Sequence, residues 1–169
     1  MDRQQIATKL VMDALGLQVR MQNFDDRLVL QKAVYLAQEA GVNLGYQFHW
    51  YLRGPYSPVL TRDGFAIVSE LDGEDESKAW KLDDRSMERL RRLAGAFVCA
   101  DTRRMSRRLE LLASVHFLVA RGQVPKQDAS AVAERLRRFG KRYDKEDVRK
   151  AIEALTKHGA LEAPAEARS

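Results

Sequence analysis

Cysteine is nearly absent from this sequence of 169 residues, which contains only Cys99. A single cysteine excludes an intramolecular disulfide and a zinc site built on several thiolates, so nothing indicates an oxidising compartment. Cys99 follows Phe97 and Val98, and this apolar neighbourhood predicts a buried thiol. No run of about 18 apolar residues is present, and the polar residues 1–9 do not resemble a secretion signal. We therefore expect a cytoplasmic protein without a membrane segment.

Recognisable catalytic motifs are missing as well. The sequence has no GxSxG pattern, no phosphate-binding P-loop and no glycine-rich dinucleotide fingerprint. Its three histidines, His49, His116 and His158, lie far apart in the sequence, so we expect neither a metal nor another cofactor. His116 falls on an apolar helical stripe, which is typical of a core histidine. We expect a protein that is not an enzyme; a site assembled in space, for example from Tyr35, His49 and Asp63, is the remaining enzymatic alternative.

The residues that are present fit one soluble domain, with 45% hydrophobic and 31% charged side chains. Positive charge is concentrated in the second half: residues 1–84 carry 9 basic and 13 acidic residues, whereas residues 85–169 carry 20 basic and 11 acidic residues. A polyanion would therefore meet the second half. No linker or repeat divides the chain, so we expect one globular domain over residues 1–162 and a frayed tail over 163–169.

Apolar residues at spacings of three and four predict a mainly α (α+β) fold, a compact bundle of about six to seven helices. The expected helices cover 3–15, the segment from Asp25 or Asp26 to Gly41, 58–71 with an interruption at Gly64, 86–100, a long helix that begins at Asp101 or Thr102, the segment from Asp128 or Ser130 to Phe139, and 144–157.

The period changes to two between Tyr46 and Leu52, which predicts a β-strand that ends at Gly54-Pro55. The inward positions would be Tyr46, Phe48, Trp50 and Leu52. Residues 78–83 alternate in the same way and predict a second strand. We expect the two strands to form a small two-stranded β wing with winged-helix-like features.

The outward face of the first strand and the turn after it combine aromatic and polar side chains. Such surfaces anchor protein partners or stack bases. We predict that a partner binds through the aromatic Gly-Pro turn, residues 46–58, and in particular through His49, Tyr51, Arg53, Tyr56 and Ser57.

Two segments resemble a known family. Residues 30–37 read LQKAVYLA and residues 48–57 read FHWYLRGPYS, an arrangement similar to uncharacterised bacterial YwgA-like proteins and, more distantly, to the Panacea (SocA-like) antitoxin domain. The resemblance covers about residues 26–65. Residues that match the motif are Gln31, Lys32 and Tyr35 on the helix and Trp50, Gly54, Pro55 and Tyr56 on the strand and turn.

The resemblance implies a compact helical domain with a small β element, an antitoxin or adaptor role as in Panacea members, and no established catalysis. Together with the aromatic turn, it leads us to expect a non-catalytic bacterial protein-interaction module. The module would be antitoxin-like or would regulate a neighbouring effector.

A nucleic-acid-binding protein is the alternative. Four arginines at i, i+1, i+4 and i+5 of one predicted helix would form a narrow cationic stripe, and arginine suits phosphate. The residues that would contact nucleic acid are Arg103, Arg104, Arg107, Arg108, Arg135, Arg138 and Arg142. The last predicted helix is similar to the second helix of winged helix-turn-helix domains, which fits a regulator or a DNA-docking subunit of a defence system. Neighbouring acids such as Glu110 and Glu134 fit ordinary solvated helices equally well.

Overall fold

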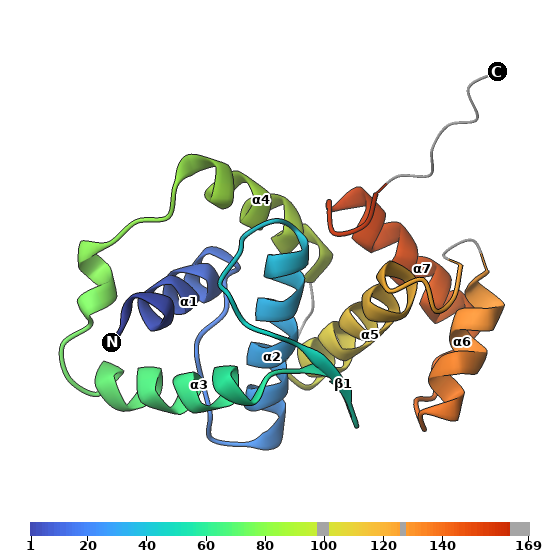
Figure 1. The fold of residues 1–169 in the computed structure, drawn as a ribbon, viewed down its shortest axis with the longest axis horizontal. Coiled ribbons are helices and arrows are strands. Elements are labelled where there is room, and N and C mark those ends of the chain that lie inside the picture. The colour runs from blue at the N-terminus through green and yellow to red at the C-terminus, as the bar shows by residue number, and fades with distance from the viewer. Residues whose placement is uncertain (98–101, 126–127, 163–169) are drawn as a thin grey trace.

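A computed structural model describes residues 1–97, 102–125 and 128–162 of the chain (Figure 1). These residues form seven α-helices and one two-stranded antiparallel sheet, which confirms the predicted mainly α fold class. The α-helices are α1 (Arg3–Ala14), α2 (Phe24–Glu39), α3 (Pro58–Leu71), α4 (Asp84–Ala94), α5 (Thr102–Ala120), α6 (Ala129–Arg138) and α7 (Lys145–Lys157). The strands are β1 (His49–Tyr51) and β2 (Gly54–Tyr56), and two short 3-10 helices are η1 (Glu76–Ala79) and η2 (Gly95–Phe97).

Helix α2 is the centre of the molecule. It packs against α1 and α3 on one side and against α5 and the β1–β2 hairpin on the other (Figure 1). Its residues 28–37 are all buried, and α6 and α7 complete the fold by packing on α5. Buried hydrophobic side chains from all of these helices form one continuous cluster. The apolar spacing found in the sequence therefore reflects burial in a shared core.

The helices differ from the prediction in three places: the start of α2, the continuity of α3, and the predicted helix 86–100, whose described part forms α4 and then η2. Helix α2 is capped by Asn23, two or three residues earlier than expected: the Asn23 side chain accepts from the Asp26 amide and the Asp26 carboxylate accepts from the Asn23 amide. Helix α3 runs through Gly64 without interruption. A Cβ atom there would lie 2.6 Å from Leu30 Cδ2, so the glycine allows α3 to approach α2 closely.

The partner of the predicted first strand is also different. The segment 78–83 is not a strand, because Glu76–Ala79 form η1. Strand β1 instead pairs with β2 directly after a turn at Leu52 and Arg53, with Trp50 opposite Pro55 and Tyr51 opposite Gly54. Gly54, at φ +88°, thus starts the returning strand instead of ending the sheet. Leu52 lies at the turn and is 76% exposed, so its predicted inward position is wrong.

In the part of the chain that the structure describes, no helix is both long enough and apolar enough to cross a membrane. Cys99 and the expected tail 163–169 lie outside the described residues.

Candidate functional site

The base of the hairpin is held to α2 by the residues that carry the family resemblance. Gln31 Nε2 donates a hydrogen bond to the Ser57 carbonyl at 2.8 Å, and the Ser57 amide donates to Gln31 Oε1 at 2.8 Å. The Lys32 amino group donates to the Pro55 carbonyl at 2.6 Å. The helix segment and the Gly-Pro segment of the motif are therefore two halves of one buried joint.

Gly54 is required at this joint for two reasons. Its φ of +88° is a conformation that favours glycine, and a Cβ atom would lie 2.6 Å from Ser114 Oγ of α5 and 3.8 Å from Lys32 Nζ. Among the described residues, the buried Ser114 hydroxyl has no hydrogen-bond partner. The hairpin backbone thus passes between α2 and α5 with no room for a side chain at position 54.

Tyr35 and His116 belong to the core, as predicted for His116. The Tyr35 hydroxyl lies 2.7 Å from His116 Nδ1, and His116 Nε2 lies 2.9 Å from the Ala160 carbonyl. Because a carbonyl only accepts, Nε2 carries the hydrogen and Nδ1 accepts from Tyr35. Burial lowers the pKa of His116 to about 4, so the ring is neutral at neutral pH.

The residues of the enzymatic alternative belong to different surroundings. Asp63 is buried and accepts a hydrogen bond from Tyr46 at 3.0 Å, whereas Tyr35 is bonded to His116 and His49 is exposed. The structure does not join Tyr35 and Asp63 in one hydrogen-bonded group. Among the described residues, no group of three or more His, Cys, Asp or Glu side chains could hold a metal ion.

The predicted partner-binding residues divide into exposed and buried ones. His49, Tyr51 and Arg53 are exposed, as expected for the outward face. Tyr56 is half-buried, and its hydroxyl accepts from Thr61 Oγ1 at 2.9 Å. Ser57 is buried, so its predicted surface position is wrong: its side chain caps α3 and its backbone is bonded to Gln31.

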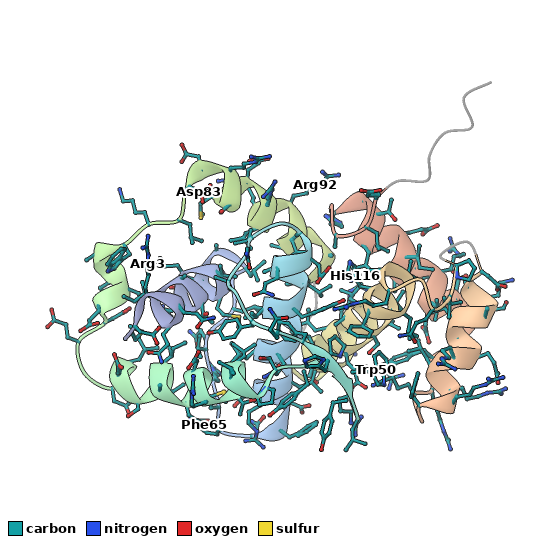
Figure 2. All side chains as sticks on the ribbon, viewed as in Figure 1. Arg3, Trp50, Phe65, Asp83, Arg92 and His116 are labelled. Carbon is teal, nitrogen blue, oxygen red and sulfur yellow. The ribbon has the colours of Figure 1, made fainter. Side chains whose placement is uncertain are left out.

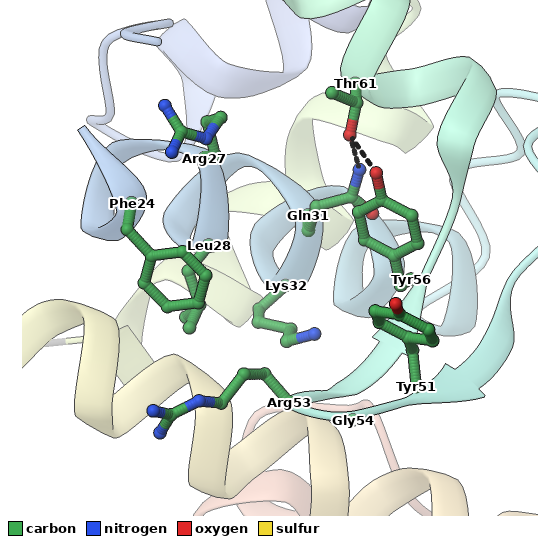
Figure 3. Close-up of a pocket in the computed structure, with 10 residues that line it drawn as sticks. All are labelled: Phe24, Arg27, Leu28, Gln31, Lys32, Tyr51, Arg53, Gly54, Tyr56 and Thr61. Atoms are coloured by element: carbon green, nitrogen blue, oxygen red, sulfur yellow. Dashed lines mark hydrogen bonds between the residues drawn. The ribbon is translucent and has the colours of Figure 1, made fainter. Parts of the chain in front are cut away.

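Two cavities lie on either side of Arg53. The first, which we call the Lys32 cavity, is about 180 Å³ and lies between α2 and the hairpin, where Lys32 extends its amino group toward the hairpin (Figure 3). The second, the Lys141 cavity, is about 650 Å³ and is lined by residues of α2, α5 and the segment after α6. Phe24, Leu28 and Arg53 line both, so the two cavities adjoin.

Each cavity contains a buried lysine with a different partner. Lys141 Nζ lies 2.5 Å from the buried Glu110 carboxylate, which also lies 3.6 Å from Arg53 Nη1. Lys32 has no ion pair among the described residues, and its one hydrogen bond there is to the Pro55 carbonyl. Burial lowers the pKa of Lys32 to about 7, with the Lys141 charge contributing in the same direction.

Exposed apolar side chains gather around these cavities. Seven large hydrophobic side chains are exposed among the described residues, and four of them line one or both cavities. We call these four and the arginine between the cavities the tip surface: Phe24, Tyr51, Leu52, Arg53 and Phe139. Trp50 packs against this surface: its ring centroid lies 4.7 Å from that of Phe139 and 5.5 Å from that of Phe117.

Sequence reasoning missed Phe24, Phe139 and the special position of Lys32. The two phenylalanines come from helix ends far from the hairpin in sequence, and no local pattern signals that they meet it. Lys32 does have a signal, because it lies at i+4 from Leu28 and i−4 from Leu36 on the apolar face of a helix. A lysine on such a face is either paired or unusual in its protonation.

The predicted nucleic-acid-binding arginines do not form one stripe. Arg108 is partly buried and its Nε donates to the Ala96 carbonyl at 2.9 Å, so its outward position is wrong. Arg107 is exposed and stacks over the Tyr143 ring at 5.0 Å. Arg104 is exposed, while the side chain of Arg103 lies outside the described part of the structure.

The later arginines remain on the surface around the end of α6. Arg135 stacks over the Phe139 ring at 5.2 Å, Arg138 lies 3.6 Å from Glu134, and Arg142 is exposed at the rim of the Lys141 cavity.

The chain matches no protein-family model, no curated protein and no solved structure. The function is therefore inferred from the site itself.

Proposed function

We propose that the protein is a non-catalytic interaction module of the bacterial cytoplasm that binds a segment of a partner protein at the tip surface. The observation that carries the proposal is the gathering of four of the seven exposed large hydrophobic side chains around two adjoining cavities. Apolar patches with polar rims are typical of interaction sites, and aromatic residues and arginine are the commonest anchors.

The charges around the cavities favour a partner segment of a particular chemistry. The basic residues that line the two cavities are Arg27, Lys32, Arg53, Arg107, Lys141 and Arg142. Only Asp25 and Glu110 are acidic, and Glu110 is already paired with Lys141. The partner segment that fits best therefore carries an apolar side chain flanked by carboxylates.

An antitoxin-like mode of action is consistent with this surface. Gln31 and Lys32 hold the hairpin base in place before any partner arrives. Binding therefore does not incur the entropic cost of ordering the hairpin. The more distant resemblance to the Panacea antitoxin domain supports the same role. In this proposal the module acts by steric occupation of an effector.

Photo-crosslinking tests which surface meets the partner. A photoreactive p-benzoylphenylalanine is placed at Leu52 on the tip surface or, as a matched control, at Phe65, which is exposed on α3 (Figure 2). We expect one defined protein adduct from the Leu52 variant in the native host and none from Phe65. Equal adducts at both positions, or an adduct only at Phe65, contradicts the tip surface.

The adduct partner is then purified and titrated against the module. Changing Tyr51 and Leu52 together to Ser is expected to weaken binding at least about tenfold, because the anchors are lost. Phe65→Ser, which changes a ring that is 50% exposed on α3, is expected to leave the affinity unchanged. Unchanged binding by the double variant contradicts the proposal.

Nucleic-acid binding is a second candidate, favoured by the exposed Arg135, Arg138 and Arg142 near the end of α6. If all three arginines contact phosphates, affinity for DNA or RNA falls by roughly 40-fold between about 50 and about 200 mM salt. Changing all three to Glu is expected to abolish that binding. Affinity that is insensitive to salt, or to the triple change, rejects this candidate.

A further inference from the structure

Lys32 is a buried amine whose donors are mostly unused. Its side chain is only 2% exposed, and among the described residues its single hydrogen bond is to the Pro55 carbonyl at 2.6 Å. A lysine ammonium has three donors, and a buried charge without a counter-ion is unfavourable. Lys32 lines a cavity, so a ligand that enters the cavity lies beside this side chain.

The lining of the Lys32 cavity selects the sign of such a ligand. Three basic residues, Arg27, Lys32 and Arg53, line it, and no Asp or Glu is among the residues that do so. The remaining surface is largely aromatic and aliphatic, with Phe24 and Tyr51 at the exposed side (Figure 3). The cavity therefore favours an anion that also presents an apolar group.

The size of the cavity limits the apolar group. At about 180 Å³ it is slightly larger than an engineered protein cavity of about 150 Å³ that accepts benzene. One aromatic ring or one branched aliphatic group fits, together with a small anionic group. A carboxylate brings one charge and two acceptor oxygens to the single buried amine, whereas a phosphate monoester brings close to two charges and three terminal oxygens.

We propose that the Lys32 cavity binds a carboxylate carried on a small apolar group, with the carboxylate at the Lys32 amino group and the apolar group against Phe24 and Tyr51. Two sources share this chemistry. One is a free organic acid, and the other is the C-terminal residue of a partner chain. The second source rests on the proposed function, whereas the first does not.

Protonation of Lys32 couples the site to pH. The charged groups around the amine are Arg27 on its own helix, Arg53 on the hairpin, Glu110 on α5 and Lys141 after α6. Because the pKa of Lys32 is lowered to about 7, the ammonium dominates only below that pH in the free protein. A bound carboxylate stabilises the ammonium, so binding above pH about 7 takes up a proton and weakens about tenfold per pH unit.

Calorimetric titration of the purified full chain tests the proposal. The probes are phenylacetate and N-acetyl-Gly-Gly-Phe with a free carboxylate, each compared with its amide. We expect both acids, or one of them, to bind at least about tenfold tighter than the matching amide, since the amide lacks the charge that pairs with the amine. Tighter binding of phenylacetate assigns a free acid as the source, and tighter binding of the peptide assigns a chain terminus.

Two variants separate the amine from general basic charge. Lys32→Met is expected to remove the preference for acid over amide, whereas Lys150→Met, which removes an exposed lysine that lines neither cavity, is expected to retain it. Circular dichroism checks that both variants fold. If Lys32→Met does not fold, the proposal is tested on the wild type alone, by its preference for acid over amide and by the loss of that preference above pH about 7.

Equal binding of acid and amide, no binding of any probe at about 5 mM, or a preference that survives in Lys32→Met overturns the proposal. These outcomes do not depend on the crosslinking result at Leu52, so the carboxylate site and the protein-binding surface can fail separately.

Discussion

The Lys141 cavity and the Lys32 cavity adjoin at Arg53 but treat their buried lysines differently. Lys141 is neutralised within the protein, 2.5 Å from Glu110 and 5.9 Å from the centre of the Trp50 ring. Among the described residues, the Lys32 amino group has one hydrogen bond, which it donates to the Pro55 carbonyl. The first arrangement ties α5 to the segment after α6 and is structural. The second leaves a buried amine with no ion pair in the described part of the chain, which is the arrangement that we propose for a binding site.

The largest effect is expected when the Lys141 pair is broken. Lys141→Met leaves the Glu110 carboxylate buried with only the more distant Arg53, which is expected to cost about 3–5 kcal/mol of unfolding free energy. Urea denaturation measures the change. Lys150→Met, which removes an exposed lysine near Glu146, is the control and is expected to change stability little. A cost below about 1 kcal/mol for Lys141→Met would show that the pair is not structural.

Removing the amine of Lys32 is expected to have an effect that depends on pH. In the unfolded chain a lysine keeps its proton to about pH 10.5, whereas folded Lys32 loses it near about 7. The unfolded state thus binds more protons between these values, and wild-type stability rises with pH through that window. Relative to Lys32→Met, the wild type is expected to gain about 3 kcal/mol between about pH 6 and about pH 9.5.

Denaturation of both proteins at the two pH values provides the measurement. The control Lys150→Met is expected to show no such difference from the wild type. If the stability difference between wild type and Lys32→Met does not change with pH, the charge of Lys32 is compensated within the folded protein, as that of Lys141 is.

The wall of the Lys32 cavity gives a smaller effect. Gly54→Ala forces a side chain to φ +88° and places its Cβ 2.6 Å from Ser114 Oγ, so a loss of about 2 kcal/mol is expected. Ser114→Ala alone is expected to be neutral or stabilising, because the hydroxyl it removes has no partner among the described residues. The loss from Gly54→Ala is expected to be smaller in the Ser114→Ala background. Strict additivity of the two changes would contradict the close packing of this wall.

The smallest effect on stability is expected at the tip surface. Tyr51→Ser and Leu52→Ser change side chains that are 60% and 76% exposed, so each is expected to alter the unfolding free energy by no more than about 0.5 kcal/mol. Thermal unfolding is the measurement. A loss of more than about 2 kcal/mol would show that these side chains belong to the core and not to the binding surface beside the two lysines.

The helices were the most predictable part of the fold, because their signals are local. Apolar spacing and a capping Asp or Pro located α1, α3, α6 and α7 to within about two residues. Tyr46 and Phe48 were placed inward by alternation alone and are buried. The pairing of β1 was not predictable in this way, because a three-residue strand with glycine and proline has no alternation to recognise, and proline is tolerated in so short an edge strand.

The candidate site was predictable only in part. The exposed face of Tyr51 and Arg53 follows from alternation next to a turn, and the structure shows both residues exposed. Phe24 and Phe139 line the same cavity because of how α2, α5 and α6 pack, which no local pattern contains. The motif resemblance predicts a structural role for Lys32. Whether a carboxylate pairs with it depends on how every neighbouring element packs, and none of the described residues supplies one.

The most direct test of the contrast between the two lysines is a titration of their side-chain resonances by nuclear magnetic resonance, with and without phenylacetate. We expect Lys32 to titrate near about 7 in the free protein, its pKa to rise when phenylacetate is added, and Lys141 not to respond. A Lys32 that titrates as an ordinary lysine near 10.5 and ignores the acid would contradict this expectation.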